Sequence, residues 1–149
     1  MFYSYLTNPR YYSPRWFHEG IAVFIETWMD GGKGNALGSY DEMFFRTRTL
    51  ENSRIYSAQG LESEGTSADF MSKANSYYYG TRFMSYVAHQ YGPTNLIEWI
   101  KRKDQSKRGF ASNFKNVFGL SISKAWDTWI DFERSFQDEN INGLKKFPI

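Results

Sequence analysis

The segment of the sequence that decides the fold is residues 14–26, which read Pro-Arg-Trp-Phe-His-Glu-Gly-Ile-Ala-Val-Phe-Ile-Glu. Apolar residues lie on nearly all sides of the helix that this segment predicts, from Pro14 to about Met29. Such a pattern predicts a helix that is buried on most sides. Ser13 is able to cap the helix, and proline suits the first helical position because its missing N–H has no partner there. The glycine-rich run at residues 30–35 ends the helix.

The composition of the chain favours one domain with a heavy core. A length of 149 residues fits a single domain that buries most of its apolar surface. Aromatic residues make up 19% of the sequence, and these large side chains contribute much buried area in a small domain. Cysteine is absent, so the chain forms neither a disulfide framework nor a thiolate metal site.

Charge and hydropathy exclude two classes of partner at the level of the sequence. The net charge is +2, and the basic residues are scattered apart from short clusters at 101–103 and 107–108. A nucleic-acid interface needs a larger basic surface, so no nucleic acid is expected. No apolar stretch approaches the roughly 20 residues of a membrane-spanning helix, so no membrane insertion is expected either.

Apolar residues at three- and four-residue spacing predict more helices, and the expected fold class is therefore mainly α, with one helical domain over residues 1–149. Glycine, proline and serine mark several of the boundaries. The further helices are expected at about residues 40–50, 77–91, 94–102, 110–118 and 121–136.

Some details of these elements are also predicted. In the helix at 40–50, the side chains of Met43, Phe44 and Leu50 are expected to point inward. The polar stretch at residues 62–67 is typical of an exposed loop, and residues 138–149 have turn-forming residues without a helical period, which predicts an irregular tail.

Glu19 is the leading candidate for a functional residue. A carboxylate inside an apolar helix costs several kcal/mol unless it is ion-paired or bound to a metal. The next residue is Gly20, which costs about 1 kcal/mol relative to alanine in a helix interior and is tolerated where another backbone approaches closely. A metal ligand beside a closely packed helix explains both residues, and an ion pair with Arg15 or a later arginine explains Glu19 equally well.

Three other residues lie near this candidate or in a similar pattern. Glu26 follows Glu19 by nearly two helical turns and shares its face, so it either orients a ligand or an incoming amine, or is a solvated acid at the helix end. His18 is able to bind substrate or to form a structural hydrogen bond. Tyr77 is the first of three adjacent tyrosines; its phenol either donates a hydrogen bond to an oxyanion or packs as an aromatic side chain.

The pattern at residues 14–26 resembles the helix Trp-x-x-Glu-Gly-x-Ala-x-Tyr-x-x-Glu of the gluzincin metallopeptidases, with Phe24 at the usual tyrosine. Within that superfamily it resembles bacterial peptidase-like domains that often precede a β-propeller. The run Tyr-Tyr-Tyr-Gly at residues 77–80 is similar to the family's Tyr-x-x-Gly helix, and residues 118–129 are similar to the helical end of such domains. These matches span nearly the whole chain.

The resemblance implies a zinc-dependent peptidase that hydrolyses peptide or protein substrates. Glu19 would be the third zinc ligand, Glu26 an acid that supports the ligands, and Tyr77 the oxyanion donor. The family supplies two histidine ligands and a general base from an H-E-x-x-H helix earlier in the chain. His18-Glu19 is not that motif, because its second histidine position is Ala22.

Two interpretations follow from the missing motif. The first is that the chain is a fragment, the C-terminal portion of a gluzincin catalytic domain, which binds zinc poorly when alone and is inactive without the H-E-x-x-H helix. The resemblance then implies zinc in the intact parent, a possible β-propeller after Ile149, and an extracytoplasmic location (periplasmic or secreted). The second is a non-catalytic scaffold, derived from a peptidase, that binds a peptide or protein. A helical domain that shares the Glu-Gly pattern by coincidence ranks behind both.

Overall fold

The computed structural model describes residues 13–36, 38–62, 72–101 and 109–147, and in these ranges it consists of seven helices and no strands. The expected mainly α fold class is therefore confirmed. The helices are α2 (Arg15–Met29), α3 (Ser39–Leu50), α4 (Ala58–Glu62), α5 (Ser72–Tyr91), α6 (Pro93–Ile100), α7 (Phe110–Phe118) and α8 (Ile122–Leu144).

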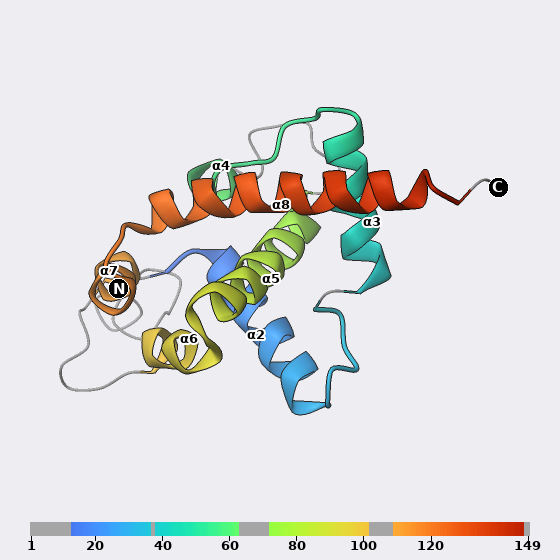
Figure 1. Ribbon diagram of the computed structural model, residues 1–149. Coiled ribbons are helices and arrows are strands. Elements are labelled where there is room, and N and C mark those ends of the chain that lie inside the picture. Colours follow the sequence, from blue (N-terminus) through green and yellow to red (C-terminus); the bar gives the residue numbers. More distant parts are fainter. Residues whose placement is uncertain (1–12, 37, 63–71, 102–108, 148–149) are drawn as a thin grey trace.

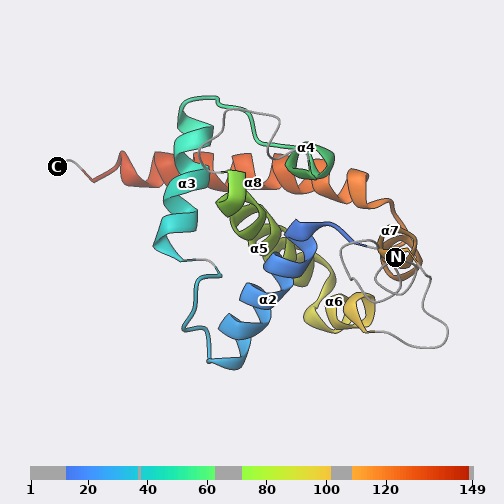
Figure 2. The ribbon, with the colours of Figure 1, turned by 180° about the vertical axis from the view of Figure 1, so that it is seen from behind.

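Helix α5 is the centre of the arrangement. It packs against α2 on one side and against α8 on another, and α8 also packs against α3 (Figure 1). The view from behind shows the same order, with α3 crossing α8 at one end of the molecule and α6 and α7 together at the other (Figure 2). None of the helices in the described ranges combines the length and apolar character that crossing a bilayer requires.

Helices α2 and α5 approach closely at a pair of glycines. A Cβ atom added to Gly20 would lie 2.6 Å from Cα of Gly80, and a Cβ atom added to Gly80 would lie 2.9 Å from Cα of Gly20. No side chain fits at such distances, so both positions require glycine. The prediction that Gly20 marks the close approach of another backbone is confirmed.

The core is built mainly from aromatic rings contributed by α2, α5 and α8. The Trp16 ring lies 4.7 Å from that of Trp126 and 5.6 Å from that of Phe83, measured between centroids, and Trp126 lies 4.8 Å from Trp129. All four side chains are at most 1% exposed. Rings in edge-to-face and tilted contact at these separations stabilise a core beyond the area that they bury.

A buried ion-pair network ties α3, α5 and α8 together. The Arg82 guanidinium donates two hydrogen bonds to the carboxylate of Glu133, at 2.7 and 3.1 Å, and a third to Glu42 at 2.7 Å. The Gln137 amide donates to both carboxylates at 2.9 Å. Burial alone would lower the pKa of Arg82, but the hydrogen bonds and charges of Glu133 and Glu42 raise it above its ordinary value, so the guanidinium stays charged.

The predicted burial of two helices was wrong in part: Phe24 and Phe44 pack against the core, whereas other apolar residues are exposed. In α2, Trp28 is 51% exposed and Met29 is 83% exposed, because α2 packs mainly through the face that carries Trp16 and Gly20. In α3, Met43 and Leu50 are exposed, Phe44 is half-buried, and the fully buried residue is Phe45. The faces that point inward are set by packing against α5 and α8, which an apolar run does not reveal.

The ends of the helices were predicted more accurately. Gly119 ends α7 with a φ of 76°, in the left-handed region that glycine adopts readily, and the hydroxyl of Ser121 caps α8 by accepting a hydrogen bond from the Lys124 N–H. Pro14, rather than Ser13, is the N-cap residue of α2, and it makes no side-chain cap. Helix α6 ends at Ile100, before the expected end at residue 102.

Two expectations concern segments between or after the helices. Helix α8 continues through Leu144, so the predicted irregular tail was wrong over residues 138–144; the buried Gln137 anchors this part of α8 against α3. The predicted loop at 62–67 lies outside the described residues, apart from Glu62 at the end of α4.

Candidate functional site

The candidate residues Glu19 and Tyr77 come from different helices and meet at Arg15. The Arg15 Nε donates a hydrogen bond to Glu19 Oε1 at 3.3 Å, one turn further along α2. The central carbon of the Arg15 guanidinium lies 5.8 Å from the centroid of the Tyr77 ring on α5. Burial alone would lower the pKa of Arg15, but the Glu19 hydrogen bond and the nearby Tyr77 hydroxyl raise it. The three groups therefore form one small polar cluster, named here the Arg15 cluster.

Glu19 is less buried than the sequence suggested. Its side chain is 22% exposed, and that of Arg15 is 33% exposed, so both reach the surface. The ion pair with Arg15 was one of the two explanations that the sequence left open, and it is the interaction that Glu19 makes. A partly exposed pair of this kind leaves the carboxylate accessible to solutes.

The other two predicted residues lie apart from the Arg15 cluster. Glu26 is exposed near the end of α2, and its side chain makes no hydrogen bond or ion pair with any residue in the described ranges. The Nε2 atom of His18 lies 2.6 Å from the hydroxyl of Ser13, and its ring packs edge-on against Phe17. His18 thus has a structural partner, and its role in substrate binding stays a prediction, as does the supporting role of Glu26.

The Arg15 cluster does not form a complete metal site on its own. In the described parts of the chain, no group of three or more histidine, cysteine, aspartate or glutamate side chains is arranged to hold a metal ion. A catalytic zinc needs three protein ligands, and Glu19 supplies one carboxylate. These residues fit a zinc site only as one part of a larger ligand set.

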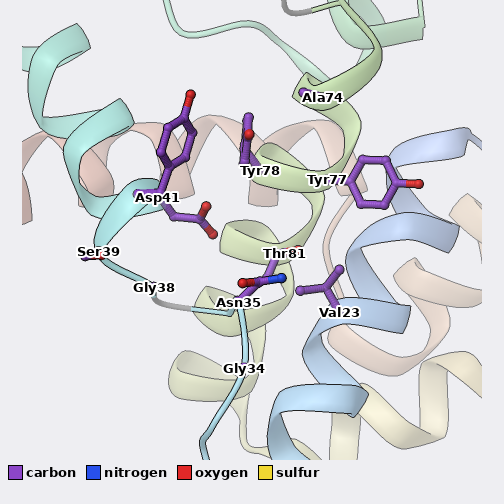
Figure 3. A pocket seen from close by; sticks show the side chains of 11 residues that line it. Val23, Gly34, Asn35, Gly38, Ser39, Asp41, Ala74, Tyr77, Tyr78 and Thr81 are labelled. Carbon is purple, nitrogen blue, oxygen red and sulfur yellow. The ribbon is translucent and has the colours of Figure 1, made fainter.

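A pocket of about 610 Å³ lies beside this cluster, between α2, α3 and α5. Tyr77 belongs both to the Arg15 cluster and to this pocket. Figure 3 shows its ring extending from α5 toward α2, at one edge of the pocket. The lining residues come from these helices and from the loop after α2. They are Val23, Gly34, Asn35, Gly38, Ser39, Tyr40, Asp41, Ala74, Tyr77, Tyr78 and Thr81.

Thr27 holds the loop that forms one wall of the pocket. Its Oγ1 donates to the carbonyl of Val23 at 2.9 Å and accepts from the N–H of Ala36 at 3.0 Å. A Cβ atom added to Gly34 would lie 2.8 Å from Cα of Thr27, so the loop packs directly on the helix. Asn35, which belongs to this loop, lines the pocket (Figure 3).

Asp41 is the most unusual group in the pocket. It is only 5% exposed, and its carboxylate has no hydrogen bond or ion pair with any of the described residues. Burial raises its pKa from 3.8 to about 6; the charge of Arg82 lowers it, and Glu42 and Glu133 raise it further. Figure 3 shows the carboxylate facing the space between α3 and α5.

Tyr78 and Thr81, which line the same pocket as Asp41, also have polar groups in buried surroundings. Burial, followed by Tyr40 and Asp41, raises the pKa of the Tyr78 phenol, and the Tyr40 and Tyr78 rings lie 5.3 Å apart. The Thr81 hydroxyl oxygen is also buried without a hydrogen-bond partner in the described residues. The pocket therefore contains aromatic faces and polar atoms that the described part of the protein does not satisfy.

Comparison of the chain with protein-family models, with curated proteins and with solved structures finds no match in any of the three.

Sequence reasoning did not find Asp41. The only signal was an acidic residue in the first turn of a helix, where a carboxylate interacts favourably with the helix dipole and is usually exposed. Nothing in the local sequence indicates that α5 and the loop after α2 cover this position.

Proposed function

We propose that this domain forms the C-terminal portion of a gluzincin-type zinc peptidase, with Glu19 as a metal ligand, Tyr77 as the oxyanion donor and peptides or proteins as substrates. The remaining ligands and the general base belong to an H-E-x-x-H segment that the printed sequence does not contain. The domain by itself is inactive.

The observation that carries the proposal is the meeting of Glu19 and Tyr77 at Arg15. The two residues are far apart in the sequence, and the contact depends on the glycine crossing of α2 and α5 directly beside them. A metal ligand and an oxyanion donor must approach the same substrate carbonyl group, so a peptidase needs both on one surface. Coincidental similarity of two separate motifs would not require this proximity.

Each of these residues has a defined task in the proposed site. Zinc, when bound, activates water and polarises the substrate carbonyl group. Glu19 would contribute a negatively charged oxygen ligand, and Tyr77 would donate its phenolic proton to a hydrogen bond with the developing oxyanion. Arg15 neutralises Glu19 in the absence of metal and would have to move aside for a cation to bind.

Cobalt(II) provides a test, because it is paramagnetic and takes nitrogen and oxygen ligands as zinc does. Amide signals of the protein are recorded by NMR during a cobalt titration. We expect weak binding, with line broadening centred on residues around Glu19. Glu19→Gln should abolish this local broadening, whereas the matched control Asp30→Asn, an exposed acid at the end of the same helix, should leave it unchanged. Arg15→Met should strengthen binding, because it removes the competing cation.

Broadening that persists in Glu19→Gln would contradict the ligand role. Sub-micromolar zinc affinity that depends on Glu19, measured by calorimetry, would contradict the idea of an incomplete site. A further check is the coding sequence upstream of Met1, where an H-E-x-x-H motif about twenty residues before Glu19 supports the peptidase.

The second candidate function is a scaffold that binds a peptide or protein without cleaving it. One observation favours it: Arg15 already provides Glu19 with a positively charged partner, so no metal is needed to stabilise the carboxylate. The cobalt titration separates the two, because the scaffold predicts the same broadening in Glu19→Gln and in the unchanged protein.

A further inference from the structure

The pocket between α2, α3 and α5 contains a buried negative charge that the described residues leave unpaired. Asp41 is 5% exposed, and its carboxylate makes no hydrogen bond or ion pair within the described ranges. An unpaired carboxylate in such a place destabilises the folded protein. A residue of this kind in a pocket is a candidate for binding a ligand.

Arg82, the cation whose charge acts on Asp41, makes no hydrogen bond to it. Arg82 uses its Nε and one terminal nitrogen for Glu133 and the other terminal nitrogen for Glu42. Its charge reaches Asp41 electrostatically, yet its hydrogen bonds are directed elsewhere. Among the described residues no cation forms an ion pair with Asp41, so the pocket is the place where a ligand could supply one.

The walls of the pocket suit an extended cationic side chain. Tyrosine rings from α3 and α5 line it, and a cation is attracted to the face of an aromatic ring. Val23 and Ala74 offer apolar surface, against which the methylene groups of lysine or arginine pack well. A volume of about 610 Å³ exceeds that of a small ion and fits an amino-acid side chain with part of its backbone.

We propose that this pocket binds the side chain of an arginine or lysine residue in a peptide ligand, with Asp41 as its counter-ion. The cation site rests on Asp41 and on the pocket. That the ligand is a peptide rests on the proposed function, because Tyr77 links the pocket to the Arg15 cluster, where the peptide bond would lie.

The test compares charged and neutral ligands of the same shape. N-acetyl-arginine amide and its neutral counterpart N-acetyl-citrulline amide are titrated into the protein, and binding is followed through the NMR amide signals of Ala74 and Thr81. N-acetyl-lysine amide and N-acetyl-norleucine amide form a second pair. We expect each cationic probe to bind at least about tenfold more tightly than its neutral counterpart, the effect of one well-placed ion pair.

The variant Asp41→Asn should remove this preference, so that arginine and citrulline probes bind alike. It keeps the shape of the side chain and removes a buried charge, so the protein is expected to fold. The matched control Asp131→Asn changes an exposed aspartate on α8 and should keep the preference. Leucine amide, whose only cation is its α-ammonium group, should bind no better than the neutral probes.

Equal binding of cationic and neutral probes, or no binding of either, would overturn the proposal, as would an undiminished preference in Asp41→Asn. Tight binding of leucine amide would overturn the assignment to a side chain. The result is independent of the metal proposal: Glu19→Gln should retain the preference for cationic probes, and Asp41→Asn should retain the cobalt broadening.

Discussion

Two carboxyl groups, Asp41 on α3 and Glu133 on α8, lie buried near α5, and only Glu133 has a partner among the described residues. Glu133 is 2% exposed and accepts two hydrogen bonds from Arg82 and one from Gln137. Asp41 is 5% exposed and has no such partner in the described residues. The sequence placed both residues on helices, but it did not indicate which of the two carboxylates has a partner.

The difference separates a structural acid from a candidate binding residue. A buried carboxylate with a bidentate arginine keeps its charge and specifies how three helices pack. A buried carboxylate that faces an open pocket destabilises the fold, and residues of this kind gather at binding sites, where function and stability conflict. Burial alone therefore does not identify a candidate binding residue; a buried charge without a partner, facing a pocket, is the stronger indication.

The largest expected effect comes from breaking the paired side of this comparison. Glu133→Gln removes the charge that neutralises the buried Arg82 and should lower the free energy of unfolding by about 3 kcal/mol. Urea unfolding followed by tryptophan fluorescence measures the change. Glu139→Gln, an exposed position on the same helix, is the matched control and should alter stability little. An equal loss in both variants would mean that the network contributes nothing specific.

Asp41→Asn should have the opposite effect and raise the free energy of unfolding near neutral pH. The pKa of Asp41 is raised to about 6 in the folded protein, so the folded state binds a proton more readily than the unfolded state. Stability from this group is therefore present below pH 4 and is lost as pH rises through 6. Above pH 7 the loss is at most about 3 kcal/mol, and solvent in the open pocket screens part of it, so the asparagine variant should be more stable by about 1–2 kcal/mol.

The measurement for Asp41 is the free energy of unfolding at pH 4 and at pH 8, for the unchanged protein and for Asp41→Asn. The two curves should converge at the lower pH. Asp131→Asn serves as the exposed control. A variant that is less stable than the unchanged protein at pH 8 would show that the carboxylate has a stabilising partner, and the comparison with Glu133 would fail.

The smallest expected effect belongs to the Arg15 cluster. Glu19→Gln removes a partly exposed ion pair between residues one helical turn apart, and the free energy of unfolding should fall by about 0.5 kcal/mol. Urea unfolding should place this variant close to Glu26→Gln, its control on the same helix. A loss of several kcal/mol would indicate that Glu19 is a structural acid like Glu133 rather than an accessible ligand.

Sequence reasoning succeeded where the signal is local. Gly20 was assigned to a close helix crossing, because a glycine inside a helix has a cost that a second backbone explains, and Gly80 lies there. Gly119 and Ser121 marked the end of α7 and the start of α8. Tyr77 and Glu19 were proposed as one site, and they meet at Arg15, although the assigned chemistry stays a prediction.

Sequence reasoning failed where the answer depends on distant neighbours. Trp28 and Met43 are apolar residues in helices, and they were expected to be buried. The packing of α2 and α3 leaves both exposed. Gln137 is polar and fully buried, and it lies in the part of α8 next to the expected irregular tail. Hydropathy measures the cost of exposing a side chain, and it does not tell which surface another helix will cover.

By itself, the sequence determined the helical class, most helix boundaries and the glycine at the central crossing, because these depend on the periodicity and backbone preferences of neighbouring residues. Only the tertiary structure decided which acid is paired and which is left open to a pocket. Arg82 and Glu133 are 51 residues apart, and Asp41 is covered by segments from both sides of it in the chain. Contacts of this range form when whole helices pack, and no local pattern specifies them.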